Sequence, residues 1–171
     1  DYKWLNENNS FKCEITNKSD EYSLLALQGP QSLELLKQIS NSNISELKYY
    51  NFIIGNIGEI KDVIISRTGY TGELGYELYV KNSFVTNLWN LLFSTNIQLN
   101  PIGLAARDTL RLEKGYCLYG NEINDFTSPI EADLTWITKF NKNFIGKDII
   151  HKVFKEGRAR KLVGIELIDK G

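Results

Sequence analysis

The sequence predicts an α+β fold in which a largely antiparallel sheet packs against helices. Short apolar runs rich in β-branched and aromatic residues, typical of strands, alternate with amphipathic stretches of helical spacing. Glycine-rich and polar turns join the strand-like runs, which favours hairpins over the long crossovers of a parallel sheet. At 171 residues, with a hydrophobic share of 42%, the chain is long enough for one full core.

The first hundred residues are expected to hold most of the sheet. Phe11 to Thr16 and Tyr22 to Leu27 have strand-like residues on either side of a polar turn. Pro30 fits the first turn of a helix that continues to about Ser40, because leucine and isoleucine recur there at helical spacing. Further strands are expected at Tyr49 to Ile54, Glu59 to Arg67 and Tyr76 to Val80, with a turn at 55–58 and a helix from Ser83 to Thr95.

The rest of the chain is expected to contain two helices and two short strands. A helix from Ile102 to Lys114 should be closed by Gly115 as a left-handed cap. Ser128-Pro-Ile-Glu131 has the spacing of a capping box, with proline at the first helical position, and predicts a helix start. The remaining expected elements are a strand at Thr135 to Phe140, a helix from Lys147 to Glu156 that ends at Gly157, and a strand at Lys161 to Ile168.

Composition narrows the class of protein. The net charge of −1 gives no electrostatic reason to expect nucleic acid or an anionic membrane as a partner. The longest apolar runs are far shorter than the roughly 20 residues of a membrane span. Cys13 and Cys117 have no metal-ligand spacing, and His151 is the only histidine, so we expect no metal site. The chain has no methionine, even at position 1, and we therefore expect a fragment.

The segment from Arg67 to Tyr79 is the strongest candidate for a binding site. Its glycines at 69, 72 and 75 permit tight turns and close approaches, and it runs into a strand on which Tyr76 and Glu77 point to opposite faces. Glu77 then offers a carboxylate on a rigid strand to a planar ligand with hydrogen-bond donors, while tyrosines such as Tyr70 and Tyr76 stack on its ring. The alternative is a plain glycine-rich hairpin with a surface glutamate.

A basic stripe marks the expected helix between Ile102 and Lys114. Arg107, Arg111 and Lys114 share one face and are flanked by alanine and leucine, so some of these cations should be partly buried and need an anion. That anion is either a carboxylate of the protein or the carboxylate tail of a ligand, which an arginine grips with two hydrogen bonds. From the residues alone, no general base or nucleophile is identified.

Five segments together resemble the T-protein of the glycine cleavage system, an aminomethyltransferase family. They occur in the family's order and span nearly the whole chain: Leu25-Ala-Leu-Gln-Gly-Pro30, Arg67-Thr-Gly-Tyr-Thr-Gly-Glu73, Gly103-Leu-Ala-Ala-Arg-Asp-Thr-Leu-Arg-Leu-Glu113, Leu118-Tyr-Gly-Asn-Glu122 and Ser128-Pro-Ile-Glu-Ala132. The resemblance implies a folate-binding, ferredoxin-like α+β architecture. It also implies transfer of an aminomethyl group from the lipoyl arm of H-protein to tetrahydrofolate, with release of ammonia.

The resemblance assigns roles by motif position. It implies that Glu77 contacts the pterin and that Arg107 belongs to the folate site, with Tyr70 and Tyr76 beside them. The expected division is a folate-binding lobe at 1–100, a helix-loop segment completing the site at 101–158, and the start of a barrel-like domain at 159–171. The expected partners are lipoylated H-protein and the P- and L-proteins, in the bacterial cytoplasm or the mitochondrial matrix.

Some family features differ or lie elsewhere. Many relatives have Gly-Glu-Asp-Gly where this chain has Gly-Glu-Leu74-Gly. The aspartate thought to assist the chemistry precedes the matching segments, so we expect no catalytic residue here and an inactive chain in isolation. Two alternatives share the fold: the folate region of a dimethylglycine or sarcosine dehydrogenase, and a non-enzymatic folate-binding protein of iron–sulfur cluster assembly. The order Tyr116-Cys117, with Asn121, favours the transferase over the latter.

Overall fold

The computed structural model describes residues 1–11, 13–166 and 168–169 as two compact units. The first unit is Asp1–Arg107 and the second is Asp108–Gly171, so the division falls inside a helix, α4 (Leu104–Glu113). Each unit is described by itself. The expected functional division at residues 100 and 158 stays a prediction.

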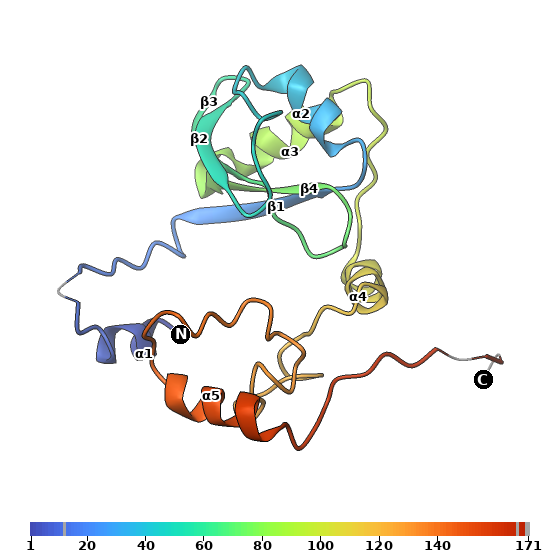
Figure 1. The fold of residues 1–171 in the computed structure, drawn as a ribbon. Coiled ribbons are helices and arrows are strands. Elements are labelled where there is room, and N and C mark those ends of the chain that lie inside the picture. The colour runs from blue at the N-terminus through green and yellow to red at the C-terminus, as the bar shows by residue number, and fades with distance from the viewer. Residues whose placement is uncertain (12, 167, 170–171) are drawn as a thin grey trace. The chain divides into compact units, whose positions relative to one another are not determined.

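The first unit is built on a four-stranded antiparallel sheet (Figure 1). Its strands stand in the order β1-β4-β3-β2, so β4 and β3 are central. The bounds are β1 Tyr22–Gln28, β2 Phe52–Ile57, β3 Ile60–Ser66 and β4 Gly75–Lys81. A tight turn at Gly58 and Glu59 joins β2 to β3, and the glycine-rich segment joins β3 to β4. The expected α+β class with an antiparallel sheet is confirmed.

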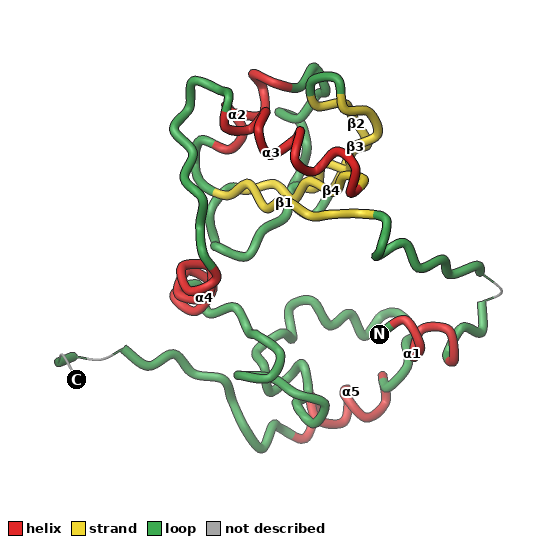
Figure 2. The backbone as a smooth tube through the Cα atoms, turned by 180° about the vertical axis from the view of Figure 1, so that it is seen from behind, coloured by secondary structure: helices red, strands yellow, loops and turns green. Residues whose placement is uncertain are grey.

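Two helices cover one face of this sheet and close the core. They are α2 (Ser32–Ile39) and α3 (Val85–Phe93), which follows the 3₁₀ turn η1 (Asn82–Phe84), and both views show them together on one side of the sheet (Figure 2). Leu36 and Leu88 have no exposed surface and pack with Leu78 and Ile65 from the central strands. Burial of each such side chain stabilises the folded state by about 1.5–3 kcal/mol. This gain decides which face of each strand turns toward the helices.

From β1 to α3, the order of helices and strands in this unit is β-α-β-β-β-α. The ferredoxin-like order, β-α-β-β-α-β, would place the second helix between the third and fourth strands. Here β3 passes directly to β4 through residues 67–74, and α3 follows β4 instead. As a result, the glycine-rich segment connects the two central strands of the sheet.

The second unit holds less regular structure. Its regular elements within the described residues are most of α4 and the helix α5 (Lys147–Glu156), which has the bounds expected from the sequence. Gly115 and Gly157 have φ values of 76° and 99°, as expected for residues that end helices. Between the helices the chain forms a series of turns, and Ile130 and Ala132 are buried there.

Three expected strands are wrong. The described residues of 11–16 are irregular, with Lys12 outside the described part of the chain. Thr135 to Phe140 forms turns instead, since the Thr138 amide donates to the Thr135 carbonyl at 3.1 Å. Within 161–168, the described residues pair with no strand. Strand-like composition does not suffice without a partner to complete the backbone hydrogen bonds.

Other differences concern element boundaries. A short helix, α1 (Tyr2–Glu7), was not expected, because six residues are too few to show a periodic pattern. The strand β2 begins at Phe52 and continues to Ile57, so the expected turn at 55–58 begins only at Gly58. A register shift between Gly55 and Ile57 accommodates this longer strand.

The expected capping box forms, but no helix follows it. The Ser128 amide donates to Glu131 Oε2 at 3.0 Å, and the Ile130 amide donates to Ser128 Oγ at 3.2 Å. Asp133 then takes a left-handed φ of 61°, which ends the turn. The predicted capping hydrogen bonds are therefore confirmed. The prediction that a helix starts at Ser128 is wrong, because turns follow instead.

Candidate functional site

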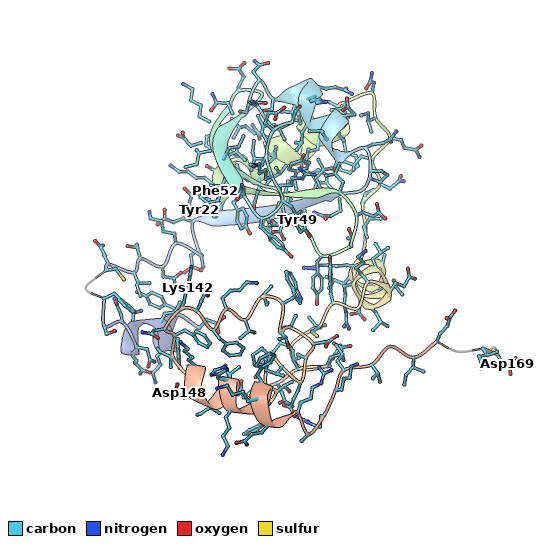
Figure 3. All side chains as sticks on the ribbon, viewed as in Figure 1. Tyr22, Tyr49, Phe52, Lys142, Asp148 and Asp169 are labelled. Carbon is cyan, nitrogen blue, oxygen red and sulfur yellow. The ribbon has the colours of Figure 1, made fainter. Side chains whose placement is uncertain are left out.

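Glu77 lies near the middle of the sheet, on the face opposite α2 and α3. Strand pairing puts Ala26 and Ser66 on either side of it, with Phe52 beyond Ser66. Figure 3 labels Phe52, which is 62% exposed, at the start of β2. We call this the outer face, formed by Leu24, Ala26, Phe52, Ile54, Ile64, Ser66, Glu77 and Tyr79. It is a mainly apolar surface with one acid, and the half-buried Glu77 is held on a central strand.

A hydroxyl from the glycine-rich segment holds the Glu77 carboxylate. Thr68 Oγ1 donates to Glu77 Oε2 at 2.5 Å. Thr68 Oγ1 also lies 3.0 Å from Ser66 Oγ, so Ser66 is placed to donate to Thr68 while Thr68 donates to Glu77. No lysine or arginine among the described residues forms an ion pair with Glu77. The carboxylate is thus oriented by neutral hydroxyl groups.

Tyr79 follows Glu77 on the same face of β4. Burial raises the pKa of its phenol, and the neighbouring Glu77 carboxylate adds to that rise. Tyr79 therefore remains a neutral hydrogen-bonding group at physiological pH. Beside it the outer face has an open hollow of about 460 Å³. The hollow is lined by Lys18, Ser19, Tyr22, Ser23, Leu24, Ile64 and Tyr79.

Tyr76 and Glu77 point to opposite faces of β4, as the alternation predicts. Tyr76 is only 1% exposed and belongs to the hydrophobic core. Burial raises the pKa of its phenol, with the Arg67 and Lys37 charges acting against that rise. A side chain with almost no accessible surface cannot stack on a ligand ring. Tyr76 is therefore a core residue, and we leave it out of the proposed site.

The glycine-rich segment is held by the last residue of β1, Gln28, and by Gly29 after it. Gln28 Nε2 donates to the carbonyls of Thr68 and Tyr76, at 3.4 and 3.3 Å. At the other end of the segment, the Gly29 amide donates to the Leu74 carbonyl at 2.7 Å. The segment is therefore a loop whose two ends, at Thr68 and Leu74, are both hydrogen-bonded to residues 28 and 29.

The three glycines of this loop serve two different needs. Gly72 has a φ of 78°, a left-handed conformation that glycine adopts without strain. At Gly69 and Gly75, an added Cβ would overlap Gln28 Oε1. A Cβ at either position would displace the Gln28 amide, which lies against their backbone. Conformational freedom is the requirement at one glycine and close approach at the other two.

Arg107 and Tyr70 are brought together in the first unit. The guanidinium carbon of Arg107 lies 4.6 Å from the centre of the Tyr70 ring, in a cation–π contact. Arg107 is exposed and forms no ion pair with a carboxylate of the described residues. Both residues were candidates from the sequence, and their contact places a cation beside the glycine-rich loop.

Arg111, one turn further along α4, has protein carboxylates as its partners. It is 2% exposed, its Nε donates to Asp108 Oδ1 and its Nη1 donates to Glu122 Oε2, both at 2.7 Å. The same Nη1 lies 3.0 Å from the Tyr116 carbonyl. The basic stripe was expected to pair either with carboxylates of the protein or with a ligand, and at Arg111 the first alternative is confirmed. This residue has no free surface for a ligand's carboxylate tail.

The Arg111 contacts organise the loop that follows α4. Glu122 Oε2 also accepts from the Leu118 amide at 2.9 Å, so one oxygen joins the helix to both ends of the loop. The hydrogen bond from Arg111 holds the pKa of Glu122 below its ordinary value, and the Glu122 and Asp108 hydrogen bonds raise the pKa of Arg111. Burial raises the pKa of Cys117 in the same loop, so its thiol stays protonated.

Sequence reasoning missed three residues around Glu77. Thr68 donates to the carboxylate, Ser66 lies beside the Thr68 hydroxyl, and Gln28 donates to the Thr68 and Tyr76 carbonyls, yet no general pattern marks these residues as functional. For Gln28 and Thr68 the available signal was their position inside two of the recognised segments, at 25–30 and 67–73; Ser66 lies one residue before the second. The structure shows that these segments contact each other through Gln28.

Neither a metal site nor a membrane-spanning helix is found among the described residues. No group of three or more histidine, cysteine, aspartate or glutamate side chains is placed there to hold a metal ion. None of the helices in that part of the chain is long and apolar enough to cross a membrane.

Comparisons with known proteins match the chain to one family. The model of the GCVT N-terminal domain matches residues 1–142. An aminomethyltransferase from Halothermothrix orenii is 50% identical, over 100% of this chain and 48% of that protein. One from Flavobacterium psychrophilum is 47% identical, over 99% of this chain and 48% of that protein. The chain spans about half the length of the curated relatives it matches.

A solved structure supports the same assignment. The glycine cleavage system aminomethyltransferase T from Bartonella henselae superposes with a TM-score of 0.79 at 33% sequence identity. The match covers 91% of this chain and 42% of that one. The similarity therefore extends over both the sheet and the following helical segment.

Proposed function

The chain belongs to the GCVT N-terminal domain family, and on that premise we propose that it forms the folate-recognition part of a glycine cleavage aminomethyltransferase. The names of its curated relatives favour this function over the dehydrogenase and iron–sulfur alternatives. The observation that carries the proposal is Glu77. This half-buried carboxylate on a central strand is oriented by a threonine hydroxyl and has no cation partner among the described residues.

Glu77 is suited to the pterin end of tetrahydrofolate. A pterin presents an amide N–H and an amino group side by side, and a carboxylate accepts two parallel hydrogen bonds from such a pair. Thr68 fixes one carboxylate oxygen, which limits rotation of the side chain before the ligand arrives. The apolar outer face around Glu77 gives the flat ring a surface to contact.

Arg107 and Tyr70 are proposed to act beside the glycine-rich loop. The exposed guanidinium lies over the tyrosine ring, which restrains it without neutralising its charge. Such an arginine can bind the anionic end of a folate or position its carboxylate. Arg111 is left out of this role because it is buried and already paired with Asp108 and Glu122.

The proposed reaction transfers an aminomethyl group from the lipoyl arm of H-protein to tetrahydrofolate. Two folate nitrogens each form a bond to the one-carbon unit, whose bonds to sulfur and to the departing ammonia break, and the two folate protons pass to those leaving groups. The residues of this chain bind and orient the folate. We propose P- and L-proteins as the further members of the system, and a cytoplasmic location on the basis of the bacterial relatives.

Replacement of Glu77 tests this proposal. In the whole protein that carries this sequence, Glu77→Ala should weaken tetrahydrofolate binding by roughly 10- to 150-fold, which corresponds to about 1.5–3 kcal/mol for a hydrogen bond to a charged group. Isothermal titration calorimetry measures the affinity directly. Glu73→Ala is the matched control, because Glu73 is an exposed glutamate of the same glycine-rich segment. Unchanged affinity in Glu77→Ala, or an equal loss in both variants, would remove Glu77 from the site.

A further inference from the structure

The side chain of Gln28 lies beneath the glycine-rich loop, although 40 residues separate it from Thr68 in the sequence. Its amide nitrogen donates to the carbonyl of Thr68, and the second donor reaches the carbonyl of Tyr76. A primary amide has two N–H groups, so these two contacts use both. Gln28 thereby ties the start of the loop to the start of β4.

The amide of Gln28 lies against two glycines of the loop. An added Cβ at either Gly69 or Gly75 would overlap Gln28 Oε1, so the observed position of this side chain depends on both glycines. Two features of the glycine pattern thus depend on one residue from another strand.

Stability alone does not account for glutamine at this position. Gln28 Oε1 is buried and has no hydrogen-bond partner among the described residues. An unpartnered buried acceptor is costly, and the two hydrogen bonds from Nε2 are long, at 3.3 and 3.4 Å. An apolar side chain of the same length, such as methionine, would fill the space without that cost. What the amide donors add, and methionine cannot, is a direct hydrogen-bonded link between the Thr68 and Tyr76 carbonyls.

Both carbonyls belong to residues that place Glu77. Thr68 donates its hydroxyl to Glu77 Oε2, and Tyr76 immediately precedes Glu77 on β4. We propose that Gln28 is a positioning residue for folate recognition, acting through Thr68 to hold the Glu77 carboxylate in its binding orientation. This inference rests on the proposed function of Glu77.

The test compares stability with affinity in the whole protein that carries this sequence. Gln28→Met keeps the length and removes both donors, so the melting temperature should be unchanged or higher. Tetrahydrofolate binding should weaken by about 5- to 10-fold, within the range for one lost neutral hydrogen bond, here from Gln28 to the Thr68 carbonyl. Gln98→Met, at an exposed glutamine, is the control and should change neither quantity. If Gln28→Met does not fold, Gln28→Asn carries the same expectation for affinity, because its shorter amide does not span the two carbonyls.

A double-mutant cycle separates positioning from packing. Thr68→Val should weaken binding by a similar factor, Thr68→Ser should retain it, and Gln28→Met in the Thr68→Val background should cause no further loss. Wild-type affinity in the Gln28 variant would overturn the inference, as would losses that multiply in the double variant. If Glu77→Ala also binds normally, the proposed function itself fails. If Glu77→Ala loses affinity for tetrahydrofolate and Gln28→Met does not, the positioning role of Gln28 is refuted while the proposed function stands.

Discussion

Two carboxylates of this chain, Glu77 and Glu122, are held in contrasting ways. Glu122 in the second unit accepts from the guanidinium of Arg111 and from a backbone amide, and its charge is neutralised by that arginine. Glu77 in the first unit accepts from the hydroxyl of Thr68, and no cation of the described residues pairs with it. The hydrogen-bond partner of each carboxylate, rather than its burial, therefore distinguishes the structural Glu122 from the candidate ligand-binding Glu77.

Two arginines of α4 repeat the contrast. Arg111 is buried between Asp108 and Glu122, whereas Arg107, one turn earlier, is exposed over the Tyr70 ring. Both belong to the same basic stripe in the sequence. Arg111, which is paired with carboxylates, holds the loop after α4 in place. Arg107, which pairs with no carboxylate of the described residues, remains available to an anionic ligand.

The largest expected effect comes from removing the cation of the structural pair. Arg111→Met leaves the Glu122 carboxylate without its arginine, and breaking a buried ion pair is strongly destabilising. We expect the melting temperature of the whole protein to fall by roughly 5–10 °C. Circular dichroism during heating measures this. Lys114→Met, at an exposed cation in the turn directly after α4, is the control. Equal melting temperatures for Arg111→Met and the wild type would show that the two glutamates do not differ in the way described.

The pH dependence of stability gives a second, smaller effect. The pKa of Glu122 is lowered in the folded state from its ordinary value of 4.5 by the hydrogen bond from Arg111. Its contribution to stability is therefore complete above about pH 4.5 and is lost as pH falls through the lowered folded pKa. Glu122→Gln should remove this part of the acid loss, so its urea midpoint should fall less steeply from pH 5 to pH 3. Glu113→Gln serves as an exposed control, and parallel curves for Glu122→Gln and the wild type would contradict the assignment.

The smallest expected effect concerns the exposed arginine. Tyr70→Leu removes the ring beneath Arg107 and should lower the free energy of unfolding by about 0.5–1 kcal/mol, the range for an exposed cation–π contact. Urea unfolding measures that change, with Phe11→Leu as a control at a ring that is 84% exposed. A loss as large as that of Arg111→Met would mean that Arg107 is a structural cation like its neighbour on α4.

The regular elements that the sequence predicted well are those with a strong periodic pattern. The helix α5 has the expected bounds, and α2, α3, α4 and the four paired strands were placed to within a few residues. The three wrong strands had suitable residues but no partner strand. Helical hydrogen bonds form within one segment, whereas strand hydrogen bonds require a second segment that local sequence does not specify.

The candidate site was predictable in part for the same reason. Alternation along β4 separates Glu77 from Tyr76, and this followed from the sequence. The alternation did not reveal that Tyr76, on the other face, is buried in the core. The hydrogen bond from Thr68 joins two segments across a loop, and nothing in the residue types predicts it.

The sequence alone decides the α+β class, the glycine-rich connection before β4 and the face on which Glu77 stands, because these depend on local periodicity and backbone freedom. The tertiary structure decides that Arg111 pairs with carboxylates while Arg107 lies over a tyrosine ring, and that Gly69 and Gly75 make room for the Gln28 amide. Arg111 finds Glu122 across a loop, and Gln28 reaches beneath a segment 40 residues away. Such contacts depend on how the folded chain brings distant residues together, which no local pattern records.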